Sequence, residues 1–152
     1  MTILTPIGYV RSSRVEPIDD GWDAVEAQIE IGSEFSPDCL QGVEEFSHIE
    51  VVFLFDRVPE SAIERGARHP RDNTTWPRVG IFAQRGKNRP NRLGVAIAHL
   101  LHRQDRLLTV SGLDAIDGTP VLDIKPVVKE FLPRGEIRQP AWSHELMRHY
   151  WR

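Results

Sequence analysis

Glycine and proline divide this chain into short segments, and that spacing limits the folds it can adopt. Eleven residues of each type are spread over the 152 positions, with no internal repeat and no low-complexity tract. Both residue types favour turns and disfavour the interior of a helix. The spacing therefore predicts an all-β domain with many turns, and nothing near the start resembles the strand, glycine-rich turn and helix of a Rossmann fold.

Seven segments are rich in apolar, β-branched and aromatic residues, and we expect them to be strands. Residues 27–31 alternate between apolar and polar side chains, which predicts a half-exposed strand, whereas 51–55 are apolar throughout and predict a central strand. Two short helices are expected at 61–68, capped by Ser61, and at 142–151, with Ser143 as a possible cap. Asp117-Gly118 predicts a turn. The expected strands are 3–11, 25–31, 49–55, 79–83, 94–102, 107–113 and 121–124.

The length predicts one domain, residues 1–152, with 131–152 as a C-terminal tail that carries a short helix. The longest apolar run, 51–55, is far too short to cross a membrane, and no secretory signal is visible. Cys39 is the only cysteine, so no internal disulfide can form, which fits a cytoplasmic protein. No zinc spacing and no Ser-His-Asp pattern is visible, and we expect no metal.

Charge is distributed unevenly along the chain. Residues 1–60 carry three Arg and Lys against thirteen Asp and Glu, whereas residues 61–106 carry ten against three. A basic block of this kind suggests a face that binds an anion. The alternative is that the acidic and basic blocks lie against each other as ion pairs, and charge alone does not decide between them.

Residues 83–94 are the densest candidate for a binding site. Four cations, two Asn, two Gly and a Pro follow the expected strand 79–83. Arginine binds carboxylates and phosphates through several planar donors, glycine permits close approach of the backbone to a ligand, and proline restrains the loop. The alternative is an exposed, solvated turn.

Three other places carry polar groups next to apolar segments. Asp56 and Arg57 close the apolar run 51–55, where a barrel mouth would present binding groups; the alternative is a surface ion pair. The stretch 111–126 places Asp114 directly after an apolar segment. His48 suits a hydrogen-bonded structural role better than a catalytic one. The acidic loop 19–23 contains Trp22, which would either stack on a base or lie in an exposed turn.

Four motifs in the same order resemble the TsaA-like (TrmO) family over about residues 3–130. They are IGYVRS at 7–12, FSH at 46–48, VGIFAQR at 79–85 running to RPN at 89–91, and LD, DGTPV and DIKP within 113–126. The resemblance implies a barrel-type, non-Rossmann methyltransferase that binds S-adenosylmethionine and works as a homodimer. Members of this family methylate N6 of threonylcarbamoyl-modified adenosine beside the tRNA anticodon, so tRNA is the implied partner.

Transferred motif by motif, the resemblance also implies individual roles. The cofactor-binding residues it implies are Asp56, Arg57, Arg85, Val95, Ser111, Gly112, Leu113 and Asp114. The acidic loop 19–22 falls near a further cofactor segment. We expect Arg89, Asn91 and Arg92 to bind substrate, and Asp114 to be the catalytic carboxylate that orients or accepts the N6 hydrogen while Arg85 or Arg89 binds the acidic threonyl group.

Two departures from the family pattern affect substrate recognition. Arg92 stands where the family loop usually has a second proline, and the chain carries only the tail 131–152 where some bacterial members have a C-terminal domain. A methyltransferase acting on a small anionic metabolite and a non-catalytic RNA-binding module therefore remain as alternatives.

Overall fold

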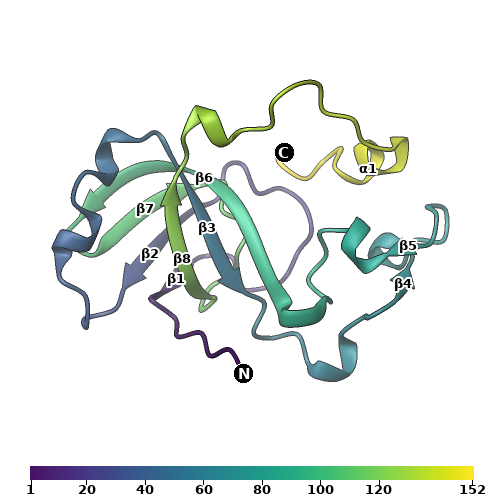
Figure 1. Ribbon diagram of the computed structural model, residues 1–152, viewed down its shortest axis with the longest axis horizontal. Coiled ribbons are helices and arrows are strands. Elements are labelled where there is room, and N and C mark those ends of the chain that lie inside the picture. The colour runs from purple at the N-terminus through teal and green to yellow at the C-terminus, as the bar shows by residue number, and fades with distance from the viewer.

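A closed, antiparallel six-stranded barrel forms the body of the protein in a computed structural model that describes residues 1–152. The strand order around the barrel is β1-β2-β7-β6-β3-β8, and β1 pairs with β8 to close it (Figure 1). The barrel strands are β1 (Gly8–Ser12), β2 (Glu26–Ile31), β3 (His48–Leu54), β6 (Leu93–Gln104), β7 (Leu107–Ser111) and β8 (Pro120–Pro126). The all-β prediction and the barrel are confirmed.

Alternation along the strands fills the barrel with apolar side chains. Along β3, Ile49, Val51 and Phe53 point inward and are buried, while the side chains between them face outward and are partly covered. β3 pairs with β6 and β8, as each strand of a closed barrel pairs with two neighbours, and the strand expected at 49–55 is confirmed. Gly94 of β6 lies opposite Phe53, and its lack of a side chain leaves room for that ring.

Between β3 and β6, residues 55–92 leave the barrel as an excursion. It carries a separate two-stranded sheet of β4 (Ala67–Arg68) and β5 (Val79–Gly80). Short 3-10 turns fill most of the remaining connections: Pro37–Leu40, Val43–Glu45, Glu60–Ala62, Pro70–Asp72, Ile81–Ala83, Pro90–Arg92 and Lys129–Phe131.

Several of the expected elements differ from the structure. The helix predicted for 61–68 is wrong: Glu60–Ala62 form a single 3-10 turn, and the segment then extends into β4, where Gly66 accepts a hydrogen bond from Ile81. The strand expected at 79–83 stops at Gly80 and lies outside the barrel. The strand expected from residue 3 begins only at Gly8. The turn at Asp117-Gly118 is confirmed, with Gly118 at φ +82°.

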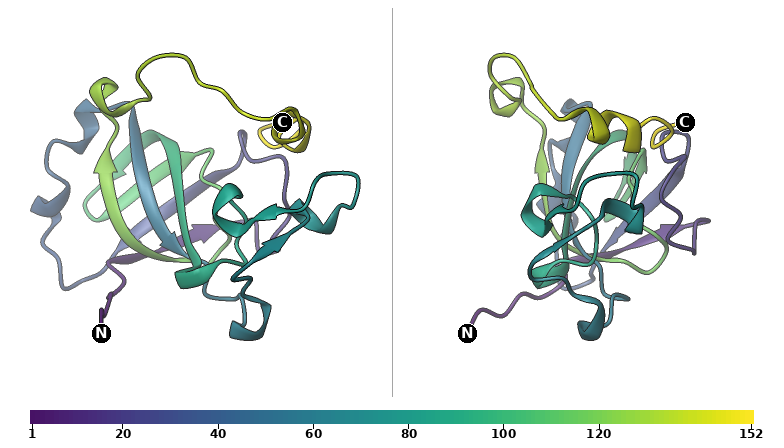
Figure 2. Two further views of the ribbon diagram at one scale, coloured as in Figure 1. Left: turned by 45° about the vertical axis from the view of Figure 1, so that its right-hand side comes forward. Right: turned by 90° about the vertical axis from the view of Figure 1, so that its right-hand side faces the viewer.

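The tail, residues 131–152, leaves the barrel after β8, arches away from it and returns beside the excursion (Figures 1 and 2). Its helix α1 (Ala141–Leu146) is shorter than the predicted 142–151. Ser143 is not its cap, because its hydroxyl lies inside the helix and donates to the Pro140 carbonyl. Trp76 of the excursion donates its indole N–H to Glu145 at 3.1 Å. None of the helices is both long and apolar enough for a membrane span.

Candidate functional site

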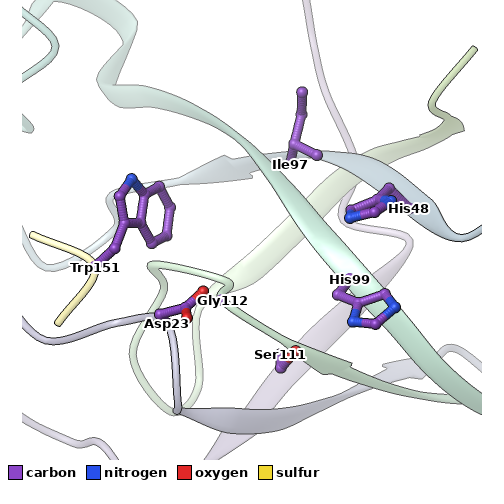
Figure 3. A pocket seen from close by; sticks show the side chains of 7 residues that line it. All are labelled: Asp23, His48, Ile97, His99, Ser111, Gly112 and Trp151. Carbon is purple, nitrogen blue, oxygen red and sulfur yellow. The ribbon is translucent and has the colours of Figure 1, made fainter. Parts of the chain in front are cut away.

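A pocket of about 490 Å³ lies on the outer face of the barrel, where β3, β6 and β7 meet the tail (Figure 3). Its lining combines aromatic rings, small polar groups and one carboxylate. The seven lining residues are Asp23, His48, Ile97, His99, Ser111, Gly112 and Trp151.

Strand register brings the two histidines and the serine together. His48 pairs with His99 across β3 and β6, and His99 pairs with Ser111 across β6 and β7. The two imidazole rings stack with centroids 4.9 Å apart. Because neighbours along a strand face opposite sides, the buried Ile49 and Ala98 direct both histidines outward. The Ser47 hydroxyl lies 2.7 Å from Nδ1 of His48 and fixes that ring. His48 is thus hydrogen-bonded, as expected, and also lines the pocket.

Gly112 turns the chain away from the end of β7. Its φ of +75° is in the left-handed region, which glycine adopts without the steric cost of a side chain. This turn lets the chain pass beneath Trp151 and beside Asp23. A Cβ on Gly112 would lie 3.9 Å from Oδ1 of Asp23 and 3.9 Å from Cζ3 of Trp151.

The tail supplies one wall of this pocket. The backbone N–H groups of Gly21, Trp22 and Asp23 donate to the carbonyls of residues 149, 150 and 151, at 3.1, 2.9 and 3.0 Å. This ladder places Trp151 against the pocket, opposite the histidines (Figure 3). The pocket is therefore built from the barrel, the loop before β2 and the tail.

Asp114 lies two residues beyond Gly112, beneath the tail. The phenolic O–H of Tyr150 donates to its Oδ2, while its Oδ1 is buried and has no hydrogen-bond partner. Burial raises the pKa of Asp114, against the opposing effects of the Tyr150 hydrogen bond and the Arg85 charge. Burial and the neighbouring Asp114 also raise the pKa of Tyr150 far above its ordinary value. Tyr150 therefore stays protonated and remains a donor at neutral pH.

The cofactor residues expected from the sequence are only partly brought together. Ser111 and Gly112 line the pocket, but the Leu113 side chain is fully buried in the barrel core, so only its backbone is available to a ligand. Val95 is exposed on the same outer face of β6 as Ile97, and Arg85 donates to the Val95 carbonyl at 2.9 Å. Arg85, Val95 and the pocket thus form a continuous surface.

Asp56 and Arg57 lie away from this surface. They follow the far end of β3, a strand length from His48, and both are exposed. Arg57 donates to the Val15 carbonyl at 3.0 Å, and no ion pair joins Arg57 to Asp56. The structure thus does not place these two residues in the same pocket as Ser111 and Gly112.

The loop expected to bind substrate is held by its own arginines. Arg89 donates to the Gln84 carbonyl at 2.7 Å, and Arg92 donates to the Val58 carbonyl at 2.7 Å. Asn91 and Arg92 have φ of +64° and +53°. A proline at position 92 could not adopt this backbone, because its ring fixes φ near −65°. The departure from the family pattern therefore accompanies a left-handed turn at this position.

Both interpretations of the charge pattern apply to part of the basic block. Arg71 pairs with Asp20 at 3.1 Å and Arg103 pairs with Glu44 at 3.2 Å, so these two cations are neutralised by the acidic lead. By contrast, Arg85, Arg89 and Arg92 donate to backbone carbonyls and form no ion pair. The basic residues of this region that have no carboxylate partner are Arg78, Arg85, Lys87, Arg89, Arg92 and Arg106.

Within the acidic loop 19–23, Trp22 is a structural residue, whereas Asp23 lines the pocket. Trp22 is only 4% exposed, the Arg14 guanidinium lies 4.2 Å from the centre of its ring, and its indole N–H donates to the Asp19 carbonyl. Trp22 therefore has no free face on which a base could stack.

Sequence reasoning missed four residues of the site. Ile97 and His99 share the outer face of β6 with Val95, and the two-residue period of a strand could have identified them. Tyr150 and Trp151 have no comparable signal, because only the docking of the tail onto the loop before β2 brings Trp151 to the pocket and Tyr150 to Asp114. Asp23 belongs to the acidic loop 19–23, which was already a candidate.

Comparisons with known proteins show a consistent pattern. Residues 12–131 match the family model of the tRNA-methyltransferase O N-terminal domain. A probable S-adenosyl-L-methionine-binding protein of Pyrococcus abyssi is 35% identical over 144 residues, which cover 91% of this chain and 74% of that protein. The tRNA (adenine(37)-N6)-methyltransferase of Escherichia coli is 37% identical over 103 residues, 65% of this chain and 42% of that protein.

Solved structures agree with these sequence matches. The crystal structure of TrmO from Pseudomonas aeruginosa matches with a TM-score of 0.72 and 30% identity, covering 91% of this chain and 61% of that one. The present chain thus spans less than two thirds of the Escherichia coli protein and of the Pseudomonas aeruginosa structure.

Proposed function

Because this chain belongs to the family of the tRNA-methyltransferase O N-terminal domain, we propose that it is an S-adenosylmethionine-dependent tRNA methyltransferase. The substrate we propose is threonylcarbamoyl-modified adenosine beside the anticodon, methylated at N6. Family membership confirms the resemblance inferred from the four sequence motifs. The names of the relatives, an S-adenosyl-L-methionine-binding protein and a tRNA (adenine(37)-N6)-methyltransferase, support the proposal. The observation that carries it is the pocket, with the buried carboxyl group of Asp114 two residues beyond its lining residue Gly112.

The residues present fit S-adenosylmethionine. A volume of about 490 Å³ lies within the roughly 300–1,000 Å³ range of small-molecule pockets. Trp151 and the stacked histidines offer aromatic faces for an adenine ring, and the Asp23 carboxylate can accept hydrogen bonds from ribose hydroxyls. Ser111 and the Gly112 backbone supply further polar groups. We assign cofactor binding to this pocket, with Arg85 and Val95 on its border.

Bound S-adenosylmethionine supplies an electrophilic methyl group, so the protein has to position the nucleophile and manage one proton. The N6 lone pair of the proposed substrate is delocalised into a urea-like group, and removing the N6 hydrogen makes it available for bond formation. Asp114 suits this role, because it lies two residues beyond the pocket residue Gly112 and its raised pKa makes the carboxylate a better proton acceptor. We therefore assign Asp114 as the proton acceptor.

Arg89, Asn91 and Arg92 are the proposed substrate-binding residues. Both arginines keep their positive charge without a carboxylate partner, and the loop that carries them is fixed by hydrogen bonds to the Gln84 and Val58 carbonyls. A fixed cationic loop suits the threonyl carboxylate of the modified base and the phosphates around it. The same charges would suit a small anionic metabolite, which is the second candidate substrate.

A homodimer is the assembly we propose, as the family resemblance implies. Val95, Ile97 and Leu101 are apolar residues on the outer face of β6, with His99 between the last two, and are 40, 45 and 43% exposed, which supports a second copy covering this face. Asp56 and Arg57 lie away from the pocket of their own chain, so their proposed contact with the cofactor is a contact with the second copy's site. A tRNA substrate and an exposed single Cys39 support a cytoplasmic location.

Thermal unfolding with S-adenosylmethionine or S-adenosylhomocysteine tests the cofactor assignment. A ligand at one hundred times its Kd stabilises the native state by about 2.7 kcal/mol, so we expect a clear rise in Tm. No rise with either ligand would contradict the enzyme proposal. RNA binding that depends on salt but not on the cofactor would instead indicate a non-catalytic RNA-binding module.

Incubation with tRNA from a strain that lacks the methylation, followed by nucleoside analysis, tests the substrate. The expected product is N6-methylated threonylcarbamoyladenosine. The Asp114→Asn variant is expected to bind S-adenosylhomocysteine as wild type does and to lose methylation. Full methylation by this variant would remove Asp114 from the mechanism, and a wild-type protein that binds the cofactor but leaves tRNA unmodified would favour the small anionic metabolite.

A further inference from the structure

The tail contributes residues to the site that the family match does not include. Resting on the methyltransferase function proposed above, we propose that Tyr150 is a positioning residue for Asp114 and that Trp151 closes the cofactor pocket. The family match ends at residue 131, whereas both aromatic residues lie within 131–152.

The position of the tail is fixed by several independent contacts. Three consecutive backbone hydrogen bonds join residues 21–23 to 149–151, and the Trp76–Glu145 hydrogen bond holds α1 against the excursion. The rings of Tyr150 and Trp151 meet edge to face with centroids 5.0 Å apart. The two side chains are thus placed by one rigid arrangement, with Tyr150 over Asp114 and Trp151 over the pocket.

Tyr150 fixes the orientation of the Asp114 carboxyl group. Its O–H donates to Oδ2, so rotation of the carboxyl group is restricted, and Oδ1 stays buried without a hydrogen-bond partner. Without this donor, the carboxyl group would lose its fixed orientation. Tyr150 therefore acts through Asp114, without touching the reacting atoms itself.

Two arginines lie close enough to affect this pair by their charge. Arg85 lowers the pKa of both Asp114 and Tyr150, and Arg71 lowers the pKa of Tyr150. Arg71 is paired with Asp20, and Arg85 is held by the Val95 carbonyl. Removing the Tyr150 hydroxyl leaves these cations in place, so the change in the pKa of Asp114 reports the loss of one hydrogen bond.

Titration of the Asp114 side-chain carboxyl carbon by 13C NMR tests the role of Tyr150 without any assay of activity. Its signal is identified by its absence in Asp114→Asn. In Tyr150→Phe we expect a higher pKa for Asp114 than in wild type, because the lost hydrogen bond stabilised the carboxylate. Tyr9→Phe is the matched control: Tyr9 is the only other tyrosine, is exposed on β1, and should leave the titration unchanged. An Asp114 pKa in Tyr150→Phe that equals or falls below the wild-type value would overturn the positioning role.

Two further measurements separate this inference from the proposed function. Trp151→Ala is expected to weaken S-adenosylhomocysteine binding at least tenfold, and wild-type affinity in this variant would overturn the closing role. In the methylation assay, the acidic limb of kcat against pH should move to higher pH in Tyr150→Phe but not in Tyr9→Phe. If wild type does not bind S-adenosylhomocysteine, the proposed function fails, while the NMR titration still decides the role of Tyr150.

Discussion

Gly94→Ala should destabilise the barrel, because the position opposite Phe53 has no room for a methyl group. A Cβ at residue 94 would lie 2.5 Å from Cε2 of Phe53, 2.6 Å from its Cζ and 2.8 Å from Cζ of Phe55. All three distances are far below van der Waals contact. Phe53 is 2% exposed and packs edge to face against Phe55, so neither ring can turn away without disturbing the core.

The expected size follows from the cost of an overfilled core. Overpacking by one methyl group costs about 1–3 kcal/mol of unfolding free energy. For a chain of this length each kcal/mol changes Tm by roughly 2–4 °C, so Gly94→Ala should lower Tm by about 2–12 °C. Heat and urea unfolding followed by circular dichroism would measure the change.

Gly80→Ala is the control, because a Cβ at Gly80 would meet no atom within 4 Å and its φ of −60° suits alanine. A second test adds Phe53→Leu to Gly94→Ala: the smaller side chain should recover part of the lost stability, as expected for two residues in direct contact. If Gly94→Ala unfolds at the same temperature as Gly80→Ala, glycine is not required at residue 94 for packing, and the argument is refuted.

Three other substitutions test separate features. Asp114→Asn should be more stable than wild type at pH 7 and not at pH 3, as urea unfolding at both pH values would show. Burial raises the folded-state pKa of Asp114 above its unfolded value, so the native state holds the proton more tightly. The stability of wild type is therefore full below the unfolded pKa and falls as pH rises through the folded pKa. Equal stability differences between the two proteins at both pH values would contradict this sign. Asp105→Gly should stabilise the β6–β7 hairpin by about 0.5–1 kcal/mol, because exposed Asp105 has φ +53° and glycine adopts that conformation at lower cost; a lower Tm would argue against it. Arg14→Lys should lower the free energy of unfolding by about 1–2 kcal/mol, because lysine cannot reproduce the two guanidinium hydrogen bonds to the Asp20 and Gly21 carbonyls, at 2.8 and 2.9 Å. Differential scanning calorimetry would measure the loss. An unchanged Tm in Arg14→Lys would show that these hydrogen bonds do not stabilise the loop.

The sequence predicts the barrel strands well, because each strand has its own local pattern. The alternation at 27–31 and the apolar run at 51–55 reflect burial on one face or on both faces of a strand, and the structure places both in the barrel. Residues 61–68 lack such a pattern. Their conformation is decided by pairing of Ala67–Arg68 with β5, a contact between segments that the sequence alone does not connect.

The same distinction applies to the site. Ser111 and Gly112 were identified through a motif, and the structure places them in the pocket. Trp151 lines that pocket only because residues 149–151 dock onto the loop before β2, and Asp23 comes to it from the other side of the same contact. Hydrogen bonds between backbones carry no side-chain pattern, so the position of Trp151 could not be predicted from residue types.

The barrel is closed by a short seam. β1 and β8 have two register pairs, Gly8 with Val121 and Tyr9 with Pro120, and backbone hydrogen bonds from Ile7, Val10 and Gly118 flank them. By contrast, β3 and β6 pair over seven positions, from His48 with His99 to Leu54 with Leu93. In the strand order, β6 and β7 lie on the opposite side of the ring from this seam. Transient opening of the barrel should therefore begin at β1 and β8, and the strands that carry the pocket should exchange their amide hydrogens last. The barrel can open transiently at the seam while the pocket on the opposite side keeps its shape.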